Sequence, residues 1–492
     1  MTVLCDLNRL TGLEIYPASL AAAGETTYFL GRRDGQKWVG AIGPSRLIGS
    51  PAGQSDDGKP VLIGPTDAFN AGVIRSALPW TAPRLVGPVT SAGLGDRLGL
   101  ATPGHVRAIR RHGNGVTPVF AQQSIREMTR TGRTPLEVMD AATWGVFQEG
   151  YAGGFGSDAD HLQRLEDVES TAAAGFTMFT IDPGQHVENH ADEMIPAQLA
   201  DRFARLEFSL LEISARDLES AYQGRTFPLP GGVEVSFPSA TFLRAAVKYG
   251  RAIAHAVRMY RHLVGVAAGE TELEISVDET QTPTTPAEHY FFAAELARMG
   301  VKWVSLAPRL VGRFEKGVDY IGDPAELRRT FAQHVAVARG CGDYKLSIHS
   351  GSDKFSVYAL LAELAGGKIH LKTAGTSYLE ALRATAMIEP PLLREILDFA
   401  RSRYETDKAS YHVSADVSKV PPAASVNDRD LPALLEDFHA RQVLHVTYGS
   451  VLTAEQGKRF REPLYAALRA HEDVYYEVLE AHLGRHVAPL AR

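Results

Sequence analysis

The sequence predicts an α/β protein whose main unit is a (β/α)8 TIM-type barrel, with a small β-rich appendage before it and a helical extension after it. Short apolar segments alternate with helical segments from about residue 84, and eight such strands occur before residue 375. This alternation favours parallel strands joined by right-handed crossovers, and eight strand–helix units close a barrel. A doubly wound open sheet is the alternative fold, but no Gly-x-Gly-x-x-Gly motif opens a helix directly after a strand.

Composition narrows the class of protein. The chain has 492 residues with a formal net charge of −7 and no basic stripe, so no nucleic-acid partner is expected. The two cysteines, Cys5 and Cys341, lie far apart, which argues against a disulfide framework and a thiolate zinc site. No apolar run approaches the ~18–20 residues that a membrane span requires, and the first residues do not resemble a signal peptide. We therefore expect a cytoplasmic protein with no membrane partner.

The first segment, residues 1–83, is predicted to be a small β-rich subdomain. TTYFLGRR and KWVGAIG indicate two short strands around a turn at Asp34 and Gly35, and VLIG indicates a further strand. No group of ionisable residues here has a catalytic pattern. We expect this segment to serve packing or oligomerisation.

Residues 84–400 are predicted to form the barrel, with a helical insertion at about 190–265. The expected strands are, in order, RLVGPV, TPVFAQQ, a poorly marked strand at 154–157, FTMFTID, ELEISVD, KWVSLAP, YKLSIHS and KIHLKTA. Helices are expected to begin at Pro103 and at Thr134–Pro135, because proline is favoured in the first helical turn.

A glycine-rich approach, GYAGGFG, precedes the stretch SDADHL, which is predicted to open the helix after the third strand. Asp160 next to His161 offers a base and a metal ligand on neighbouring residues. Aspartate is also a good N-cap, so capping is an equally strong interpretation of the motif by itself. Asp158 is expected to cap the helix or to support its neighbours.

Alternation along four of the strands predicts a polar barrel interior. Outward side chains must be apolar to pack on helices, which turns the polar ones inward. Near the carboxyl ends this inward set comprises Asp182, Asp278, His349, His370 and Lys372, with Glu279 just beyond. One such residue alone is equally compatible with a hydrogen-bonded barrel layer. Several together favour a functional site, because each unpaired buried ion costs several kcal/mol.

Histidine and carboxylate side chains at strand ends predict a divalent metal cation. Zinc, nickel, cobalt and manganese all suit this donor set, and the sequence does not choose among them. His186 and His190 are spaced four residues apart but follow Pro183–Gly184, so we expect them in a loop that supports or covers the site.

The last segment, residues 401–492, is predicted to be a mainly helical extension. Its final amphipathic helix, AALRAHEDVYYEVLEAHLGRH, is expected to cap the barrel or to form a subunit interface, which leaves a homo-oligomer open. His412 and His445 either line the rim of the site or lie in the core, and the core is the stronger expectation.

Six motifs together carry a family resemblance: GDRLGLATPGH, FTMFTIDPG, ISVDETQTPTTP, KLSIHSGSDKFSVY, KIHLKTAGTSYLEALR and HVTYGSVLT. Over residues 85–455 the chain resembles the tagaturonate epimerase family, also called hexuronate C4-epimerases, whose members interconvert tagaturonate and fructuronate. DADHL followed by IHSGS is also weakly similar to class II metal-dependent aldolases.

The resemblance implies roles for individual residues. Asp160 is the expected proton acceptor, and His161 and His349 are the expected metal ligands. His370 is our candidate for the third ligand, and Glu279 is the opposing acid or base. Asp182, Asp278 and Lys372 are expected to bind substrate, while Arg97 or Lys372 holds the uronate carboxylate, with arginine offering the better bidentate geometry.

The implied chemistry is inversion at carbon 4 of a 2-ketose. The hydrogen on carbon 4 is not adjacent to the carbonyl, so enolisation does not reach it, whereas retro-aldol cleavage and re-addition does. Transient oxidation by a tightly bound nicotinamide is the competing mechanism. A class II type ketose aldolase and a non-catalytic sugar-binding barrel protein are the alternative functions.

Overall fold

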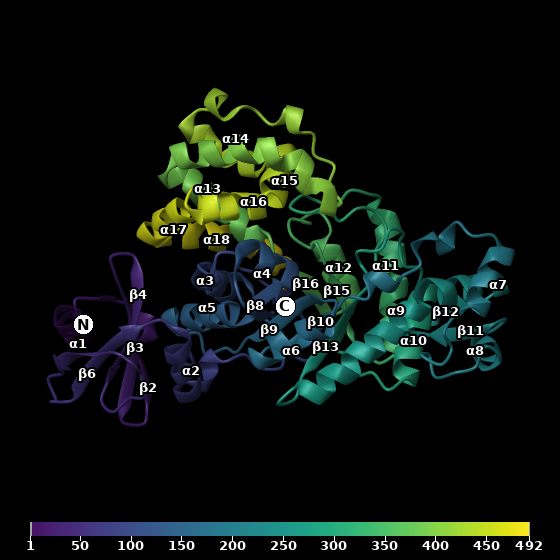
Figure 1. Cartoon of the computed structure of the whole chain (residues 1–492), viewed down its shortest axis with the longest axis horizontal. Coiled ribbons are helices and arrows are strands. Elements are labelled where there is room, and N and C mark those ends of the chain that lie inside the picture. The colour runs from purple at the N-terminus through teal and green to yellow at the C-terminus, as the bar shows by residue number, and fades with distance from the viewer. Residues whose placement is uncertain (1, 492) are drawn as a thin grey trace.

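A closed barrel of eight parallel strands forms the centre of the computed structural model, which describes residues 2–491 (Figure 1). Around the barrel the strands follow the order β10-β13-β14-β15-β16-β7-β8-β9. Their bounds are β7 (Ser91–Gly93), β8 (Thr117–Ser124), β9 (Gly156–Leu162), β10 (Met178–Ile181), β13 (Glu272–Ser276), β14 (Ser305–Ala307), β15 (Lys345–Ile348) and β16 (Ile369–Lys372). The predicted (β/α)8 fold is confirmed.

Two strand predictions were wrong in position. RLVGPV is not a strand, and the first barrel strand is the shorter β7 that follows it. SDADHL does not open a helix: it lies within β9, and helix α6 begins only at Leu165. Pairing of β9 with β8 and β10 on either side overrides the turn and cap propensities of its aspartates.

Helices cover the outside of the barrel. Capping boxes begin α5 at Thr134 and α10 at Thr285, and proline follows each capping residue. The predicted helix starts at Pro103 and Thr134–Pro135 are confirmed. The barrel helices are α3 (Thr102–His112), α4 (Ile125–Thr131), α5 (Pro135–Gln148), α6 (Leu165–Ala173), α9 (Ser239–Val266), α10 (Pro286–Arg298), α11 (Pro324–Gly340), α12 (Tyr358–Ala365) and α13 (Thr376–Ile388).

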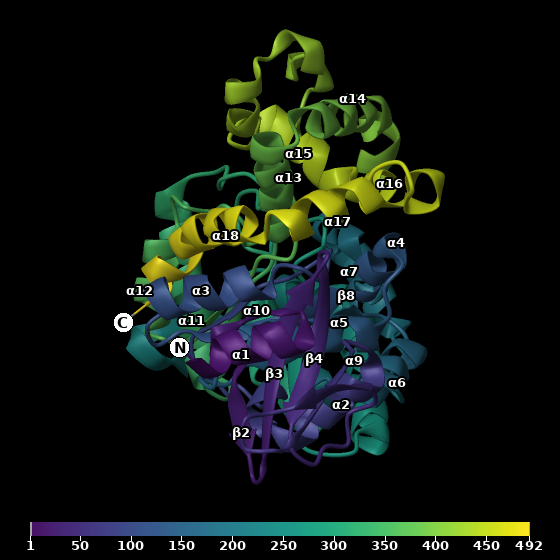
Figure 2. The same cartoon turned by 90° about the vertical axis from the view of Figure 1, so that its left-hand side faces the viewer.

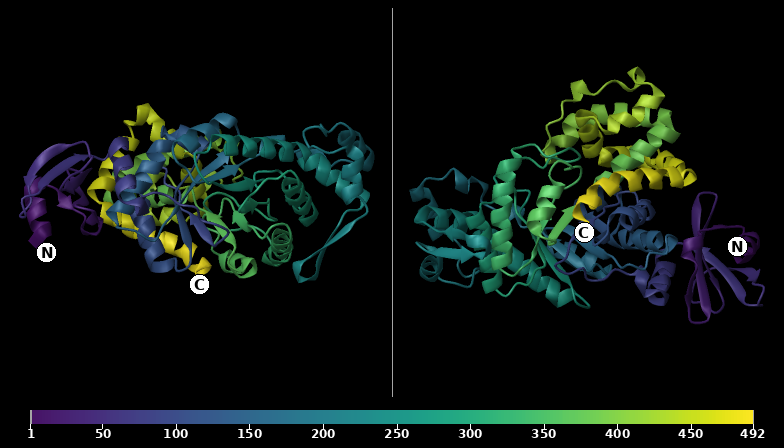
Figure 3. Two further views of the ribbon diagram at one scale, coloured as in Figure 1. Left: turned by 90° about the horizontal axis from the view of Figure 1, so that it is seen from below. Right: turned by 180° about the vertical axis from the view of Figure 1, so that it is seen from behind.

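An insertion lies between β10 and β13. It contains α7 (Pro196–Ala204), α8 (Ala215–Tyr222) and the antiparallel hairpin of β11 (Thr226–Leu229) and β12 (Val233–Ser236), which lead into α9. The segment predicted as helical therefore also holds a hairpin. Figure 3 shows the insertion and the N-terminal sheet at opposite ends of the barrel.

The N-terminal segment forms an antiparallel sheet beside the barrel. The predicted turn at Asp34–Gly35 joins β3 to β4, and both residues have positive φ, as a tight two-residue hairpin turn requires. The elements are α1 (Thr2–Thr11), β1 (Glu14–Ile15), β2 (Ala21–Ala23), β3 (Thr26–Arg33), β4 (Gln36–Ile42), β5 (Ser50–Gln54), β6 (Pro60–Pro65) and α2 (Ala68–Ala77).

The C-terminal segment is helical and returns to the barrel. It comprises α14 (Pro390–Asp407), α15 (Phe438–Val446), α16 (Tyr448–Thr453), α17 (Arg461–Ala470) and α18 (Glu472–Val487). Figure 2 shows α18 running across α3 towards α12. Of the helices in residues 2–491, none is both long and apolar enough to cross a membrane.

Candidate active site

A buried ion network fills the barrel interior. Lys372 on β16 places its Nζ 2.7 Å from Asp158 Oδ2, 2.8 Å from Asp160 Oδ1 and 2.7 Å from Glu274 Oε1, and it donates to Thr180 Oγ1 at 2.7 Å. Burial raises the pKa of Asp158 to about 6. Burial also opposes ionisation of Glu274, but the Lys372 ammonium outweighs it and holds the pKa of Glu274 well below its usual range. The Lys372 ammonium group therefore forms ion pairs with three buried carboxylates.

Two histidines lie above this network. His161 Nδ1 is 2.6 Å from Asp160 Oδ1, and His349 Nε2 is 2.6 Å from Glu274 Oε1. His349 Nδ1 lies 3.1 Å from Asp278 Oδ1, and the two imidazole rings are 5.0 Å apart between centroids. Burial lowers the pKa of each histidine, but Asp160 beside His161 and Asp278 beside His349 reverse the shift and raise it. The two imidazoles thus converge on one point above the barrel.

The backbone at His161 is unusual for a strand. Its φ is +55°, in the left-handed region that non-glycine residues rarely occupy, and the register between β9 and β10 shifts at this point. Strain of this kind persists where the surrounding structure fixes it, and it gathers at functional sites. The irregularity interrupts the strand alternation and gives Asp160 and His161, which are adjacent in sequence, access to the same pocket.

Two groups of residues at this end of the barrel have the composition of a metal site. Ligand atoms of Asp160, His161 and His349 lie within 4.8 Å of one another, and so do those of His161, Asp182 and Glu279. His161 is common to both groups. Its Nε2 is buried without a hydrogen-bond partner among the described residues. Asp278 Oδ1 lies 3.6 Å and Glu279 Oε1 4.0 Å from that atom, which can donate to a cation when the His161 ring is neutral.

A pocket opens above these groups. Besides Asp160, His161, His349 and Lys372, it is lined by Arg97, Ser124, Arg126, Glu127, Lys316, Gly317, Ser350, Ser352, Ala374, Gly375, Tyr411 and His445. Besides Lys372, three further cationic side chains, from Arg97, Arg126 and Lys316, line it. The pocket is thus suited to a small polar molecule that carries negative charge.

Several buried polar atoms in or near the pocket have no hydrogen-bond partner among the described residues. Arg97 is 4% exposed, donates through Nε to Glu127 Oε1 at 2.7 Å and stacks its guanidinium 3.7 Å above the Tyr448 ring. Among the described residues, Arg97 Nη1 has no hydrogen-bond partner, nor have the Tyr378 and Tyr448 hydroxyls and His445 Nδ1. Buried polar atoms are normally satisfied, and two of these atoms, Arg97 Nη1 and His445 Nδ1, belong to residues that line the pocket and are available to a polar ligand.

The remaining predicted carboxylates lie nearby. Glu279 contacts Arg126 Nη2 at 3.1 Å and lies 4.0 Å from Lys316 Nζ. Asp182 accepts from Gln163 Nε2 at 2.9 Å, and burial raises its pKa. Arg97, Asp160, His161, His349 and Lys372 line the pocket itself, while Asp182, Asp278 and Glu279 lie next to it through their contacts with the two histidines.

His370 does not join the two other histidines. It is fully buried, its Nδ1 lies 2.8 Å from Ser91 Oγ, and burial lowers its pKa to about 3. Within the described chain it belongs to neither metal-compatible group at the pocket. His370 and Lys372 face inward in different layers, and only Lys372 reaches the pocket.

The other histidines considered in the sequence, His186, His190 and His412, lie outside the pocket. His186 stacks on His255 with 4.0 Å between ring centroids, and His190 is exposed beside Glu193. His412 is exposed, so the expectation that it lies in the core was wrong. His445, in contrast, is buried as expected and also lines the pocket.

Several pocket residues escaped prediction from the sequence. Arg126, Lys316, Ser352 and Tyr411 lie on loops or short helices, where no alternation marks the inward face. Glu274 had the inward position in its strand but was not assigned a role. Its contacts with both Lys372 and His349 make it a central residue of the network.

Comparisons with known proteins agree with this geometry. A family model described as tagaturonate epimerase matches residues 16–490. A tagaturonate/fructuronate epimerase from Thermotoga maritima is 42% identical over 482 residues, which cover 97% of this chain and 96% of the relative.

Solved structures extend the likeness over the whole chain. A fructuronate-tagaturonate epimerase from Cohnella laeviribosi, in its native form and with two glycerol molecules, is 37% identical and covers 100% of this chain and 99% of its own. The TM-scores are 0.91 and 0.92. The family match spans nearly all of the described residues, and the protein therefore belongs to the tagaturonate epimerase family.

Proposed function

We propose that this protein interconverts D-tagaturonate and D-fructuronate by inverting carbon 4. The observation that carries the proposal is the pocket at the mouth of the barrel, where the imidazoles of His161 and His349 meet carboxylates and the cationic side chains of Arg97, Arg126 and Lys316. Membership of the epimerase family supports the same reaction. A sugar acid supplies the negative charge that such a pocket suits.

The proposed route is retro-aldol cleavage and re-addition. A base removes the proton of the 4-hydroxyl, its electron pair forms the aldehyde carbonyl, and the bond between carbons 3 and 4 breaks to give an enediolate. The aldehyde fragment turns over within the pocket, and carbon 3 attacks its other face. The new alkoxide at carbon 4 then takes back a proton.

Asp160 and Glu279 are the groups we assign to this proton transfer, one for each face of carbon 4. Burial raises the pKa of Asp160, but His161 and Lys372 outweigh burial and hold it well below its usual range, so Asp160 is ionised at neutral pH. Glu279 is also ionised, because His161 and two cations outweigh the effect of burial on its pKa. Both groups are thus deprotonated at neutral pH, which a proton acceptor requires.

Asp160, His161 and His349 would hold a divalent cation. The fit rests on the ligand atoms within 4.8 Å and on the buried, unpartnered Nε2 of His161, and the donor set suits zinc, nickel, cobalt or manganese. When bound, such a cation supplies positive charge that stabilises enediolate oxygens. In this proposal the third ligand is Asp160 and not His370, because the His370 imidazole bonds to Ser91.

Arg97 is the group we assign to the uronate carboxylate. Arg97 lines the pocket, and its Nη1 has no hydrogen-bond partner among the described residues. Lys372 is unsuited to this role because its charge is already neutralised by three carboxylates.

The fate of the hydrogen on carbon 4 tests the reaction. Purified protein is incubated with tagaturonate deuterated at carbon 4, and the products are followed by NMR. Retro-aldol cleavage never breaks the bond to this hydrogen, so fructuronate should form with the label retained. Oxidation at a neighbouring carbon followed by proton loss from carbon 4 would lose the label to solvent. Direct oxidation at carbon 4 would return the same deuterium but would slow the reaction by a primary isotope effect, which retro-aldol cleavage would not show. Free three-carbon products without an epimer would replace the proposal by an aldolase.

A further inference from the structure

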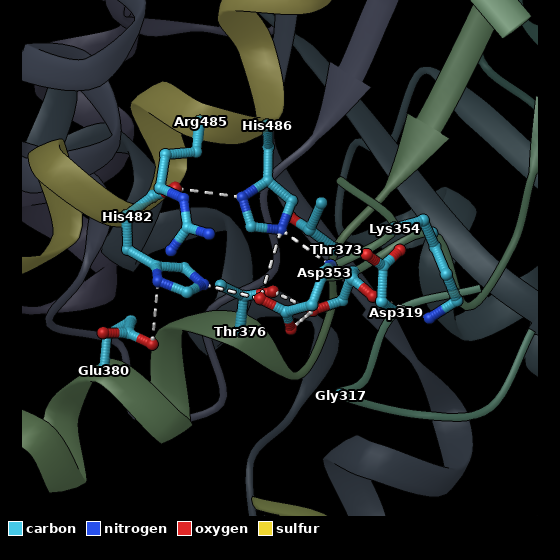
Figure 4. Close-up of polar contacts among 12 residues, drawn as sticks. Gly317, Asp319, Asp353, Lys354, Thr373, Thr376, Glu380, His482, Arg485 and His486 are labelled. Carbon is cyan, nitrogen blue, oxygen red and sulfur yellow. Dashed lines mark hydrogen bonds and ion pairs between the residues drawn. The ribbon is translucent and has the colours of Figure 1, made fainter. Parts of the chain in front are cut away.

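A second cluster of imidazole and carboxylate groups lies beside the pocket and takes no part in the proposed chemistry. Asp353 follows β15, and His482 and His486 lie one turn apart on α18 (Figure 4). All three side chains are at most 5% exposed. Asp353 Oδ1 is 2.6 Å from His482 Nε2, and the backbone N–H of Asp353 donates to His486 Nε2 at 2.9 Å. A C-terminal helix is thus bonded directly to the segment that follows His349.

The contacts within this cluster argue against a second metal site. His486 accepts a backbone N–H at Nε2, and its Nδ1 lies 3.0 Å from the carbonyl oxygen of His482, so both ring nitrogens are in use. Arg441 Nη2 lies 2.9 Å from Asp353 Oδ2 and 3.3 Å from His482 Nε2. A guanidinium therefore already supplies the positive charge that the carboxylate requires.

The segment held by this cluster is a strained loop, His349–Lys354. Ser350 and Asp353 have φ values of +49° and +64°, in the left-handed region. A Cβ at Gly351 would lie 2.4 Å from Leu371 Cδ1, so the backbone packs tightly against β16. Left-handed conformations at non-glycine residues persist where external contacts fix them. Here the contacts come from α15 and α18.

The same residues fix a second loop, Glu315–Val318. Lys354 Nζ donates to the carbonyl oxygens of Glu315 at 2.7 Å and Val318 at 2.5 Å. Arg441 Nε donates to the carbonyl oxygen of Gly317 at 2.8 Å. Both loops contribute to the pocket wall through His349, Ser350, Ser352, Lys316 and Gly317. One buried cluster therefore holds two sides of the pocket.

We propose that Asp353, His482 and Arg441 are positioning residues for the reaction, which fix the His349–Lys354 and Glu315–Val318 loops and thereby place His349 and Lys316 at the pocket. This inference rests on the proposed function. In this proposal the C-terminal helices fix two loops of the pocket wall, since α18 supplies His482 and α15 supplies Arg441. None of the three residues lines the pocket.

The test compares His482→Leu with His482→Gln and with His289→Leu. Glutamine retains a donor near the position of Nε2 and should keep the bond to Asp353, whereas leucine cannot. His289 on α10 is a matched control: it is 1% exposed and bonds to His334 and Tyr344, and it does not line the pocket. Each variant is examined by hydrogen exchange of the peptide spanning 349–357, by thermal unfolding and by steady-state kinetics.

We expect His482→Leu to lose exchange protection in this peptide and to lose kcat by about 10- to 100-fold, as when groups that orient reactive side chains are removed. His482→Gln should recover most of both, and His289→Leu should lower thermal stability without changing either. Unchanged protection and kcat in folded His482→Leu, or losses that merely match those of His289→Leu, would overturn the inference. If the wild type forms no epimer, the proposed function fails, while the exchange data still decide whether the cluster fixes the loop.

Discussion

Nζ of Lys372 lies 2.8 Å from Oδ1 of Asp160, although the strands that carry them, β16 and β9, are separated by β7 and β8 around the barrel. The contact therefore crosses the barrel interior. Together with the contacts to Asp158 and Glu274, it makes Lys372 the cation that balances the buried carboxylates. If Lys372 only balances these carboxylates, its substitution should lower stability. If it binds substrate, its substitution should raise KM.

Lys372→Met is expected to unfold the protein more readily. Removing one partner of a buried ion pair typically costs about 3–5 kcal/mol, because the remaining charge is left uncompensated. Urea denaturation at neutral pH measures the loss. Adding Asp158→Asn to Lys372→Met should recover part of it, since one buried negative charge is then removed. A variant with normal stability and only a raised KM would assign Lys372 to the substrate instead.

Arg97→Gln is expected to change substrate selectivity. A hydrogen bond to a charged group contributes about 1.5–3 kcal/mol, which corresponds to about 10- to 100-fold in kcat/KM for the uronate. The neutral ketose tagatose has no carboxylate, so its kcat/KM should change little. The ratio of the two values measures the effect.

Arg75→Gln provides the matched control for Arg97. Arg75 is partly buried and, like Arg97, pairs with a carboxylate, Asp140 at 2.6 Å, but it does not line the pocket. Its substitution should lower stability and leave the ratio unchanged. Equal losses for uronate and neutral ketose in Arg97→Gln would mean that the guanidinium only supports the pocket wall.

Strand periodicity accounts for what could be predicted of the site. Alternation along regular strands identified Asp278, His349 and Lys372, because an outward polar residue would have to pack against a helix. The same rule turned His370 inward correctly but did not reveal its layer, which depends on the stagger of β16 against β7. Sequence patterns alone do not specify that stagger.

The parts that escaped prediction depend on tertiary contacts. SDADHL has the composition of a capped helix start, yet Lys372, some two hundred residues later, neutralises its aspartates and permits a strand. Lys316 and Ser352 lie on loops whose contacts come from distant residues: Arg441 donates to the Gly317 carbonyl oxygen and pairs with Asp353, which accepts from Ser352. No local signal reports a contact of this kind.

Metal content should depend on His161 and His349 and not on His370. His161→Ala and His349→Ala each remove a donor from the group at the pocket, so the purified variants should lose bound divalent cation. His370→Asn keeps the pocket donors and can still bond to Ser91, so it should retain the wild-type content. Elemental analysis of the purified proteins decides this. Loss of the cation from His370→Asn alone would restore His370 as a ligand and displace Asp160 from that role.

His370 also predicts how stability depends on pH. Burial lowers its pKa from 6.5 to about 3 in the folded protein. Between these values the unfolded chain binds the proton and the folded protein does not, so this imidazole makes folding less favourable as pH falls below 6.5. The effect is at most about 1.4 kcal/mol for each pH unit in that window. Asparagine does not titrate, so His370→Asn should lose less stability than the wild type between pH 6.5 and pH 4, as measured by urea denaturation at each pH. If the difference in unfolding free energy between the two proteins stays constant over that range, the His370 imidazole is protonated in the folded state as well. The claim that burial lowers the pKa of His370 would then be wrong.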